Sequence, residues 1–151
     1  MSIWWSLHLR REAASVPLAR RLLLGTMETA GVDPDVSYEL SVALTEACAN
    51  AVEHGGRGAV GRGAASEAYR VTAYLDGETC RIEVADSGPG FSGTLVEHRT
   101  AAADDAEHGR GLRLIEELAD HVHFGRTGRG GALVSFDKII KWRADAPLAL
   151  T

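Results

Sequence analysis

The residues best placed to do chemistry stand on one predicted helix, between Asp33 and Gly56. Glu46, Asn50 and His54 follow one another at four-residue steps, so a helix places a carboxylate, an amide and an imidazole on one side. Taken alone, this pattern is typical of a helix face that is simply solvated. The segments that follow in the chain favour a functional interpretation.

The helix that carries these side chains has recognisable ends and an apolar face. Asp33 and Pro34 are typical of a helix start, because the carboxylate caps free N–H groups and proline gives up a donor that had no partner. Gly55 and Gly56 are typical of a stop. The residues expected to face the core recur at three- and four-residue steps: Leu40, Ala43, Leu44, Ala47 and Ala51.

A second candidate site is the sequence Gly109-Arg110-Gly111, which is predicted to open another helix. Glycines at a helix start present unobstructed N–H groups at its positive end, which makes this a plausible seat for a phosphate. In the same predicted helix Leu112, Ile115, Leu118 and Ala119 are spaced for burial.

Motifs of the common nucleotide folds are accidental or absent. The run from Gly88 to Gly93 matches the dinucleotide pattern G-x-G-x-x-G by letter, but Pro89 and the loop-like residues beyond do not make the required helix. The chain has no G-x-x-x-x-G-K-[ST] and no catalytic loop of the H-R-D type, so a P-loop or protein-kinase fold is not supported.

Composition is that of one ordinary globular domain. The chain has 151 residues, 45% of them hydrophobic and 25% charged. We expect a domain over residues 1–142 and a loose tail over 143–151. The net charge of −5 argues against binding nucleic-acid phosphates, and no signal peptide or membrane-length apolar run is apparent, so we expect a cytoplasmic protein without membrane contact. Cys48 and Cys80 lack metal-ligand spacing and are predicted to be buried, reduced thiols.

The remaining elements are predicted from periodicity and turn signals. Residues 3–9 alternate as a strand, and a helix runs from Ser15 as its cap to Gly31 as its stop. Asp76-Gly77 predicts a tight turn between two strands, and VHFG and ALVSFDKIIKW predict a final hairpin. Residues 55–67 are predicted to form a flexible loop, and the long segment 86–112 a lid over a ligand.

Four patterns in this order resemble the GHKL ATPase/kinase superfamily, the nucleotide fold of DNA gyrase and bacterial histidine kinases. They are Glu46-x-x-x-Asn50 on a helix, Asp86-x-Gly88-x-Gly90 after a strand, Gly109-x-Gly111-Leu112 opening a helix, and Gly130-Gly131 before the final strand. The segments EACANAVEH and GRGLRLI are similar to those of anti-sigma factor serine kinases. The resemblance covers about residues 3–142.

The resemblance implies an α+β fold, a two-layer alpha/beta sandwich of the Bergerat type. A mixed β-sheet would carry helices on one face, and ATP would lie between the helices and the lid. Glu46 would be the general base, Asn50 would hold Mg²⁺, and Asp86 would accept a hydrogen bond from the adenine amino group. The other cofactor-binding residues would be Gly88 and Gly90 beside the ring, Gly109, Arg110 and Gly111 at the phosphates, and Leu112.

Two functions follow from the resemblance. The first is a serine/threonine-protein kinase that phosphorylates an anti-sigma-factor antagonist and sequesters a sigma factor, and so regulates transcription. The alternative is an ATP-gated protein-binding module without kinase activity. Ala132 stands where the family commonly has threonine, and the loop 55–67 is long and glycine-rich for the family; both departures leave the alternative open. An isolated catalytic piece of a histidine kinase fits less well.

A homodimer is also expected. Members of the family generally pair, and the first helix carries more apolar width than one core face requires, with Leu18, Leu22, Leu23, Leu24 and Met27.

Overall fold

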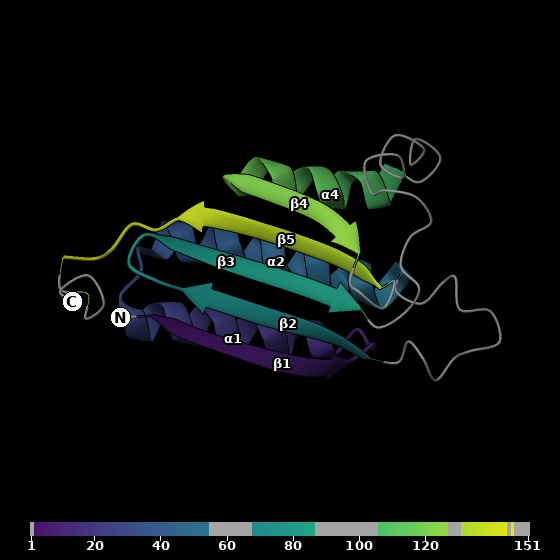
Figure 1. Ribbon diagram of the computed structural model, residues 1–151, viewed down its shortest axis with the longest axis horizontal. Coiled ribbons are helices and arrows are strands. Elements are labelled where there is room, and N and C mark those ends of the chain that lie inside the picture. The colour runs from purple at the N-terminus through teal and green to yellow at the C-terminus, as the bar shows by residue number, and fades with distance from the viewer. Residues whose placement is uncertain (1, 55–67, 87–105, 127–130, 145, 147–151) are drawn as a thin grey trace.

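The computed structural model describes residues 2–54, 68–86, 106–126, 131–144 and 146, and for residues 54 and 106–110 the backbone only. The elements in these ranges are β1 (Ile3–Arg10), α1 (Ser15–Ala30), α2 (Pro34–His54), β2 (Ala68–Leu75), β3 (Thr79–Asp86), α4 (Ala106–Leu118), β4 (His121–Arg126) and β5 (Ala132–Ile139). The strands form one sheet in the order β1-β2-β3-β5-β4, and the three helices lie against one face of it (Figure 1). This arrangement confirms the predicted two-layer α+β fold.

The sheet differs from the expectation in one respect. Each neighbouring pair of described strands is antiparallel, so the prediction of a mixed sheet is wrong. The reason lies in the connections. Between β1 and β2 the chain runs back along α1 and forward along α2, so β2 starts where β1 ended and points the opposite way (Figure 1). After β3 the chain returns along α4, runs forward along β4 and turns back into β5, so β5 is antiparallel to β3.

The core fills the space between sheet and helices. The alternating burial of β1 confirms that its odd-numbered residues face inward and its even-numbered ones face solvent. In register, each inward residue meets buried partners on the next strands, as in the row Leu7, Val71, Val84 and Val134. The largest side chains that the helices bury are Leu23, Met27, Leu40, Leu44, Leu112 and Ile115.

The end of α1 and the start of α2 are as the sequence predicts. Gly31 ends α1 in the left-handed conformation, with φ 91°, and its N–H donates to the carbonyls of Met27 and Glu28. Asp33 starts α2, because its Oδ2 accepts the N–H of Asp35 at 3.1 Å and of Val36 at 3.4 Å.

The prediction that Ser15 caps the first helix is wrong. Ser15 is the first residue of α1 rather than its cap, and its hydroxyl hydrogen-bonds the Glu12 carbonyl at 2.7 Å and the Tyr69 hydroxyl at 2.6 Å. Arg143, expected in a loose tail, is held to the end of α1: its N–H donates to the carbonyl of Gly31 at 2.8 Å and its guanidinium to that of Glu28 at 3.1 Å.

The hairpin between β2 and β3 forms as predicted. Asp76 fixes the turn, because its Oδ1 accepts the N–H groups of Glu78 and Thr79, both at 2.8 Å. These bonds hold the pKa of the Asp76 carboxyl below its ordinary value of 3.8. The turn lies at the end of the sheet opposite Asp86, as the course of β3 in Figure 1 shows.

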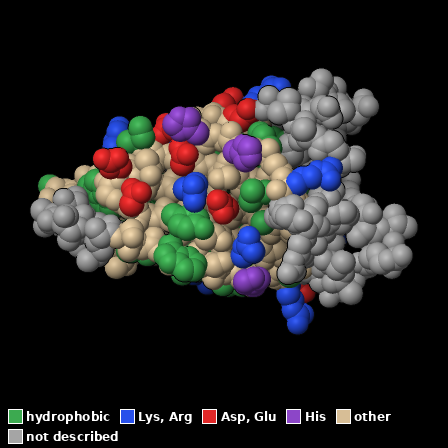
Figure 2. Space-filling model, in the orientation of Figure 1, with side chains coloured by type: hydrophobic (Ala, Val, Ile, Leu, Met, Phe, Trp, Pro, Cys, Tyr) green, Lys and Arg blue, Asp and Glu red, His purple; other side chains and the backbone are tan. Residues whose placement is uncertain are grey.

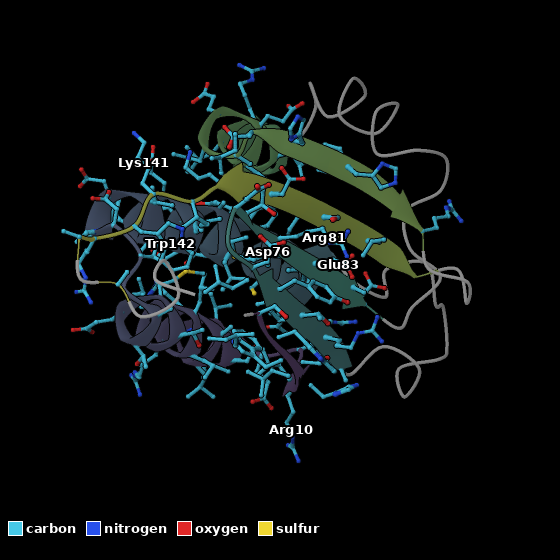
Figure 3. All side chains as sticks on the ribbon, turned by 60° about the vertical axis from the view of Figure 1, so that its left-hand side comes forward. Arg10, Asp76, Arg81, Glu83, Lys141 and Trp142 are labelled. Carbon is cyan, nitrogen blue, oxygen red and sulfur yellow. The ribbon has the colours of Figure 1, made fainter. Side chains whose placement is uncertain are left out.

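No described element covers the other face of the sheet, which carries mostly polar side chains (Figure 2). Arg81 and Glu83 lie 3.6 Å apart on β3 (Figure 3), and Arg81 stands 4.7 Å over the ring of Tyr74. Trp4 stacks on the same tyrosine, with a centroid distance of 6.3 Å. Among the described helices, none combines the length and apolar character needed to cross a bilayer.

Candidate active site

The candidate site lies at the end of the sheet where β3 stops and β5 starts. Asp86 is the last residue of β3, and its side chain is only 6% exposed. Its Oδ1 accepts the N–H of Ala132, the first residue of β5, at 3.3 Å. A buried carboxylate is costly unless hydrogen bonds compensate for the lost water. The neighbouring strand therefore supplies a donor that helps to hold Asp86 in place.

Asp86 shares a small cavity with Asn50. The cavity is lined by Ala47, Asn50 and Ala51 from α2, Val84 and Asp86 from β3, and Ala132 and Val134 from β5. Its lining is therefore apolar apart from Asn50 and Asp86. The volume is ≈ 10 Å³, room for about one water molecule. A planar ring would fit between these walls only if they moved apart.

Glu46 stands one helical turn before Asn50 and meets the glycine motif of α4. A Cβ atom built on Gly111 would lie 3.0 Å from Glu46 Oε2, closer than nearly all real Cβ contacts. Gly111 thus leaves room for the Glu46 carboxylate, which is half-buried between the packed helices α2 and α4. The structure brings together two motifs that are more than sixty residues apart in the chain.

The prediction that α4 opens at Gly109 is wrong. The helix begins at Ala106, less than one helical turn before Gly109. Only the first four N–H groups of a helix, counted from its N-cap, lack a partner inside it, so the amides of Gly109, Arg110 and Gly111 all lie in the helical ladder. Leu112 is 1% exposed and its side chain belongs to the core.

Several predicted site residues lie outside the described residues. These are Gly88, Gly90 and Gly130, together with most of the predicted lid 86–112 and the loop 55–67. For Arg110 and His54 the structure describes the backbone in α4 and α2, and not the side chain.

The sequence did not point to Tyr69, whose position is central. Tyr69 is the register partner of Asp86 on β2 and is 2% exposed. Its hydroxyl hydrogen-bonds the Ser15 hydroxyl at 2.6 Å, so it ties α1 to the strand beside Asp86. Burial raises its pKa above the ordinary value. A tyrosine at an inward position of a strand was the available signal.

Two alanines of the cavity are further site residues that are not among those predicted from the sequence. Ala47 and Ala51 flank Asn50 on α2 and form part of the wall opposite the sheet, although the sequence placed them only in the core. Their spacing around Asn50 was the signal, because small side chains leave room beside a polar one. Among the described residues, no three of the types His, Cys, Asp and Glu are grouped so as to bind a metal.

Solved structures share this fold. The structure superposes, over 91% of this chain, on a crystal structure of the RsbU and RsbW domains of Rv1364c from Mycobacterium tuberculosis, with a TM-score of 0.63 and 22% sequence identity. The chain spans 33% of that longer one. A crystal structure of the SiaB-SiaC complex from Pseudomonas aeruginosa matches 90% of this chain and 89% of its own, with a TM-score of 0.56 and 16% identity. No match is found among curated proteins.

The family assignment rests on the sequence. The model of the histidine kinase-like ATPase domain matches residues 9–138, a range that contains α2, Asp86 and the glycine motif of α4. This confirms the resemblance stated above and implies that the domain binds ATP. The chain belongs to the histidine kinase-like ATPase domain family.

Proposed function

We propose that this protein is an ATP-dependent serine kinase that phosphorylates an anti-sigma-factor antagonist and also sequesters a sigma factor. One observation carries the proposal: Asn50 and Asp86 line one cavity, and Glu46, one turn away on α2, lies against Gly111 of α4. The candidate base, Glu46, and one residue of the candidate nucleotide site, Asn50, thus lie one turn apart on α2.

The residues present fit ATP by their chemistry. Asp86 is a buried acceptor between apolar walls, which suits the amino group of a purine. The Ala132 N–H, which donates to Asp86 Oδ1, helps to hold the carboxylate in place. The narrowness of the cavity implies that the walls separate when the ring binds. ATP supplies the phosphoryl group, and this chain supplies positioning and proton transfer.

We assign Mg²⁺ to Asn50. One amide oxygen is a small protein contribution, but Mg²⁺ keeps several waters and takes other ligands from substrate phosphates. Gly109, Arg110 and Gly111 lie in the first two turns of α4, and we place them near the phosphates because the positive end of a helix favours negative charge. Glu46 takes the proton of the incoming serine hydroxyl, since a carboxylate held between two helices is positioned without being closed off from solvent.

The Glu46→Gln variant tests this role. It keeps the size and hydrogen bonding of the side chain but removes the base, so single-turnover phosphate transfer to the antagonist should fall by about a hundred- to ten-thousand-fold. ATP titration of both forms should give nearly equal affinities. Equal transfer rates would refute the role of Glu46, and loss of nucleotide binding would make this residue structural instead.

The ATP-gated binding module stays a second candidate because of Ala132. This residue lines the cavity beside Asp86, where a threonine hydroxyl would add a hydrogen bond to the adenine ring or to a water molecule. If the protein is a binding module, the unmutated protein should transfer no phosphate to any candidate antagonist, and ATP should still change its affinity for a partner. Partner titrations with and without Mg-ATP, beside the transfer assay, distinguish the two functions.

We further propose a homodimer in the cytoplasm. The exposed pair of Trp4 and Tyr74 on the uncovered sheet face is an apolar surface that a second copy could bury. Sedimentation of the unmutated protein and of Trp4→Ala tests this, and a monomer in both cases would contradict it.

A further inference from the structure

A second hollow lies far from the Asp86 cavity, between the start of β1 and the outer face of α1. It is an open groove of ≈ 660 Å³, lined by Ile3 of β1 and by α1 residues that include Leu18, Arg21, Leu22 and Gly25. Leu18 is 53% exposed and Leu22 40%, so the apolar width that the sequence predicts for this helix is indeed left uncovered by the described residues. The two hollows share no lining residue.

The groove runs beside a strand that can accept another one. β1 stands at the edge of the described sheet, with β2 as its only neighbour. It has eight residues, contains no proline, and carries no Lys, Arg, Asp or Glu before Arg10 at its end. Natural edge strands usually carry charges, prolines or bulges that prevent further pairing. β1 lacks these protections.

Gly25 is a second, independent observation. It lies inside α1, where glycine is less favourable than alanine. A Cβ atom built on Gly25 would have nothing within 4 Å, so the packing of the protein itself does not require glycine there. A glycine on the floor of an exposed groove allows another backbone to approach the helix closely.

Charge indicates which partner fits. Among the described residues that line the groove, Arg21 is the only charged one. Its side chain is exposed and forms no ion pair with the described residues. In a two-fold dimer through this face, the same surface would meet itself and bring Arg21 toward its own copy. A carboxylate on a different protein complements the groove better.

We propose that this groove binds an extended, apolar segment of a partner protein that carries a carboxylate. The segment adds as a strand to the free edge of β1, packs alternate side chains against Leu18 and Leu22, and places its carboxylate at Arg21. The helix from Leu18 to Thr29 is roughly 16 Å long, which matches about five residues of extended chain. This inference does not rest on the kinase proposal.

The probe is a displayed library of random peptides of about seven residues, selected on the full chain. Selected peptides should alternate apolar residues and contain Asp or Glu. By fluorescence anisotropy, Arg21→Glu and Leu22→Asp should each weaken their binding at least ten-fold. Leu24→Asp is the matched control, because Leu24 is an exposed leucine of the same helix outside the groove, and it should bind like the unmutated protein.

Any of several results would overturn the proposal. These are failure to select any peptide, selection of basic peptides, or equal losses in Leu22→Asp and Leu24→Asp. Hydrogen exchange gives a further check: bound peptide should slow exchange of β1 amides, and protection of α1 alone would exclude strand addition. If Leu22→Asp converts a dimer to a monomer in sedimentation, a second copy is the occupant and the proposal is wrong.

Gly25→Ala separates binding from folding. Because alanine favours the helix and its methyl group has free space, we expect the melting temperature to rise by about 2–4 °C. Peptide binding should weaken by about three- to ten-fold, and Gly25→Leu should abolish it. A Gly25→Ala protein that binds peptide as tightly as the unmutated one would show that no backbone approaches this glycine.

Discussion

Two helical glycines mark two regions that are built for different purposes. At the contact of α2 with α4, a Cβ on Gly111 would lie 3.0 Å from Glu46 Oε2, whereas on the outer face of α1 a Cβ on Gly25 would meet nothing within 4 Å. At the first glycine, an added Cβ would force a neighbouring side chain of the same chain to shift. The second is not required by anything inside the described protein. The difference shows that one region is complete in its packing and the other is open.

Burial shows the same contrast. Next to Gly111, Leu112 is 1% exposed and Ile115 is fully buried, so α4 is fixed against the core. Next to Gly25, Leu22 and Leu24 remain exposed. Substitutions in the first region should therefore change chemistry or nucleotide binding, and substitutions in the second should leave both unchanged.

The largest expected effect on binding in the first region comes from its polar residues. Asn50→Ala and Asp86→Ala should each weaken Mg-ATP binding about ten- to a hundred-fold, because each removes a hydrogen bond or ligand worth roughly 1.5–3 kcal/mol. Isothermal titration measures this, with Leu22→Ala in the groove as the control. Unchanged affinity in both variants would remove the basis of the nucleotide site.

A smaller effect is expected from Gly111→Ala. The added methyl group would push the Glu46 carboxylate by a few tenths of an ångström, and misplacement of a catalytic group by about 1 Å can cost roughly a hundred-fold in rate. We therefore expect transfer to fall about ten-fold, with ATP affinity little changed. Gly25→Ala is the matched control and should transfer at the full rate. A Gly111→Ala enzyme of normal activity would mean that the position of Glu46 is unimportant.

The smallest effect is expected at the hairpin turn, which serves stability alone. The folded-state pKa of Asp76 is lowered by the N–H groups of Thr79 and Glu78, so its contribution to stability is present above the ordinary value of 3.8 and is lost as pH falls through the folded value. Asp76→Asn should therefore melt lower than the unmutated protein at neutral pH, and the gap should close in acid. A gap that is independent of pH would exclude this role, and ATP affinity should not change.

How far the sequence predicts the molecule depends on how local the signal is. The starts and stops at Asp33 and Gly31, and the turn at Asp76, follow from short-range hydrogen bonds and were predicted correctly. The start of α4 differs from the prediction, because Gly109 and Gly111 lie inside the helix and do not open it. The close approach of Glu46 to α4 is a sufficient reason for glycine at position 111.

The site was predicted only as a set of residues. Periodicity places Glu46 and Asn50 on one side of α2, but only the folded chain shows that Asn50 and Asp86 line the same cavity. The relative direction of the strands depends on all the elements that lie between them in the chain. The role of Tyr69 depends on the strand register, and neither can be seen in a local pattern.

The two cysteines offer a means of following how the folded protein opens. Cys48 and Cys80 are free and buried, on α2 and at the start of β3, and burial raises the pKa of each thiol to about 12. At neutral pH almost no reactive thiolate forms in the closed state, so an alkylating reagent modifies them only when the core around them opens. Labelling rates read by mass spectrometry would then compare opening beside the nucleotide site with opening near the turn, without introducing any probe.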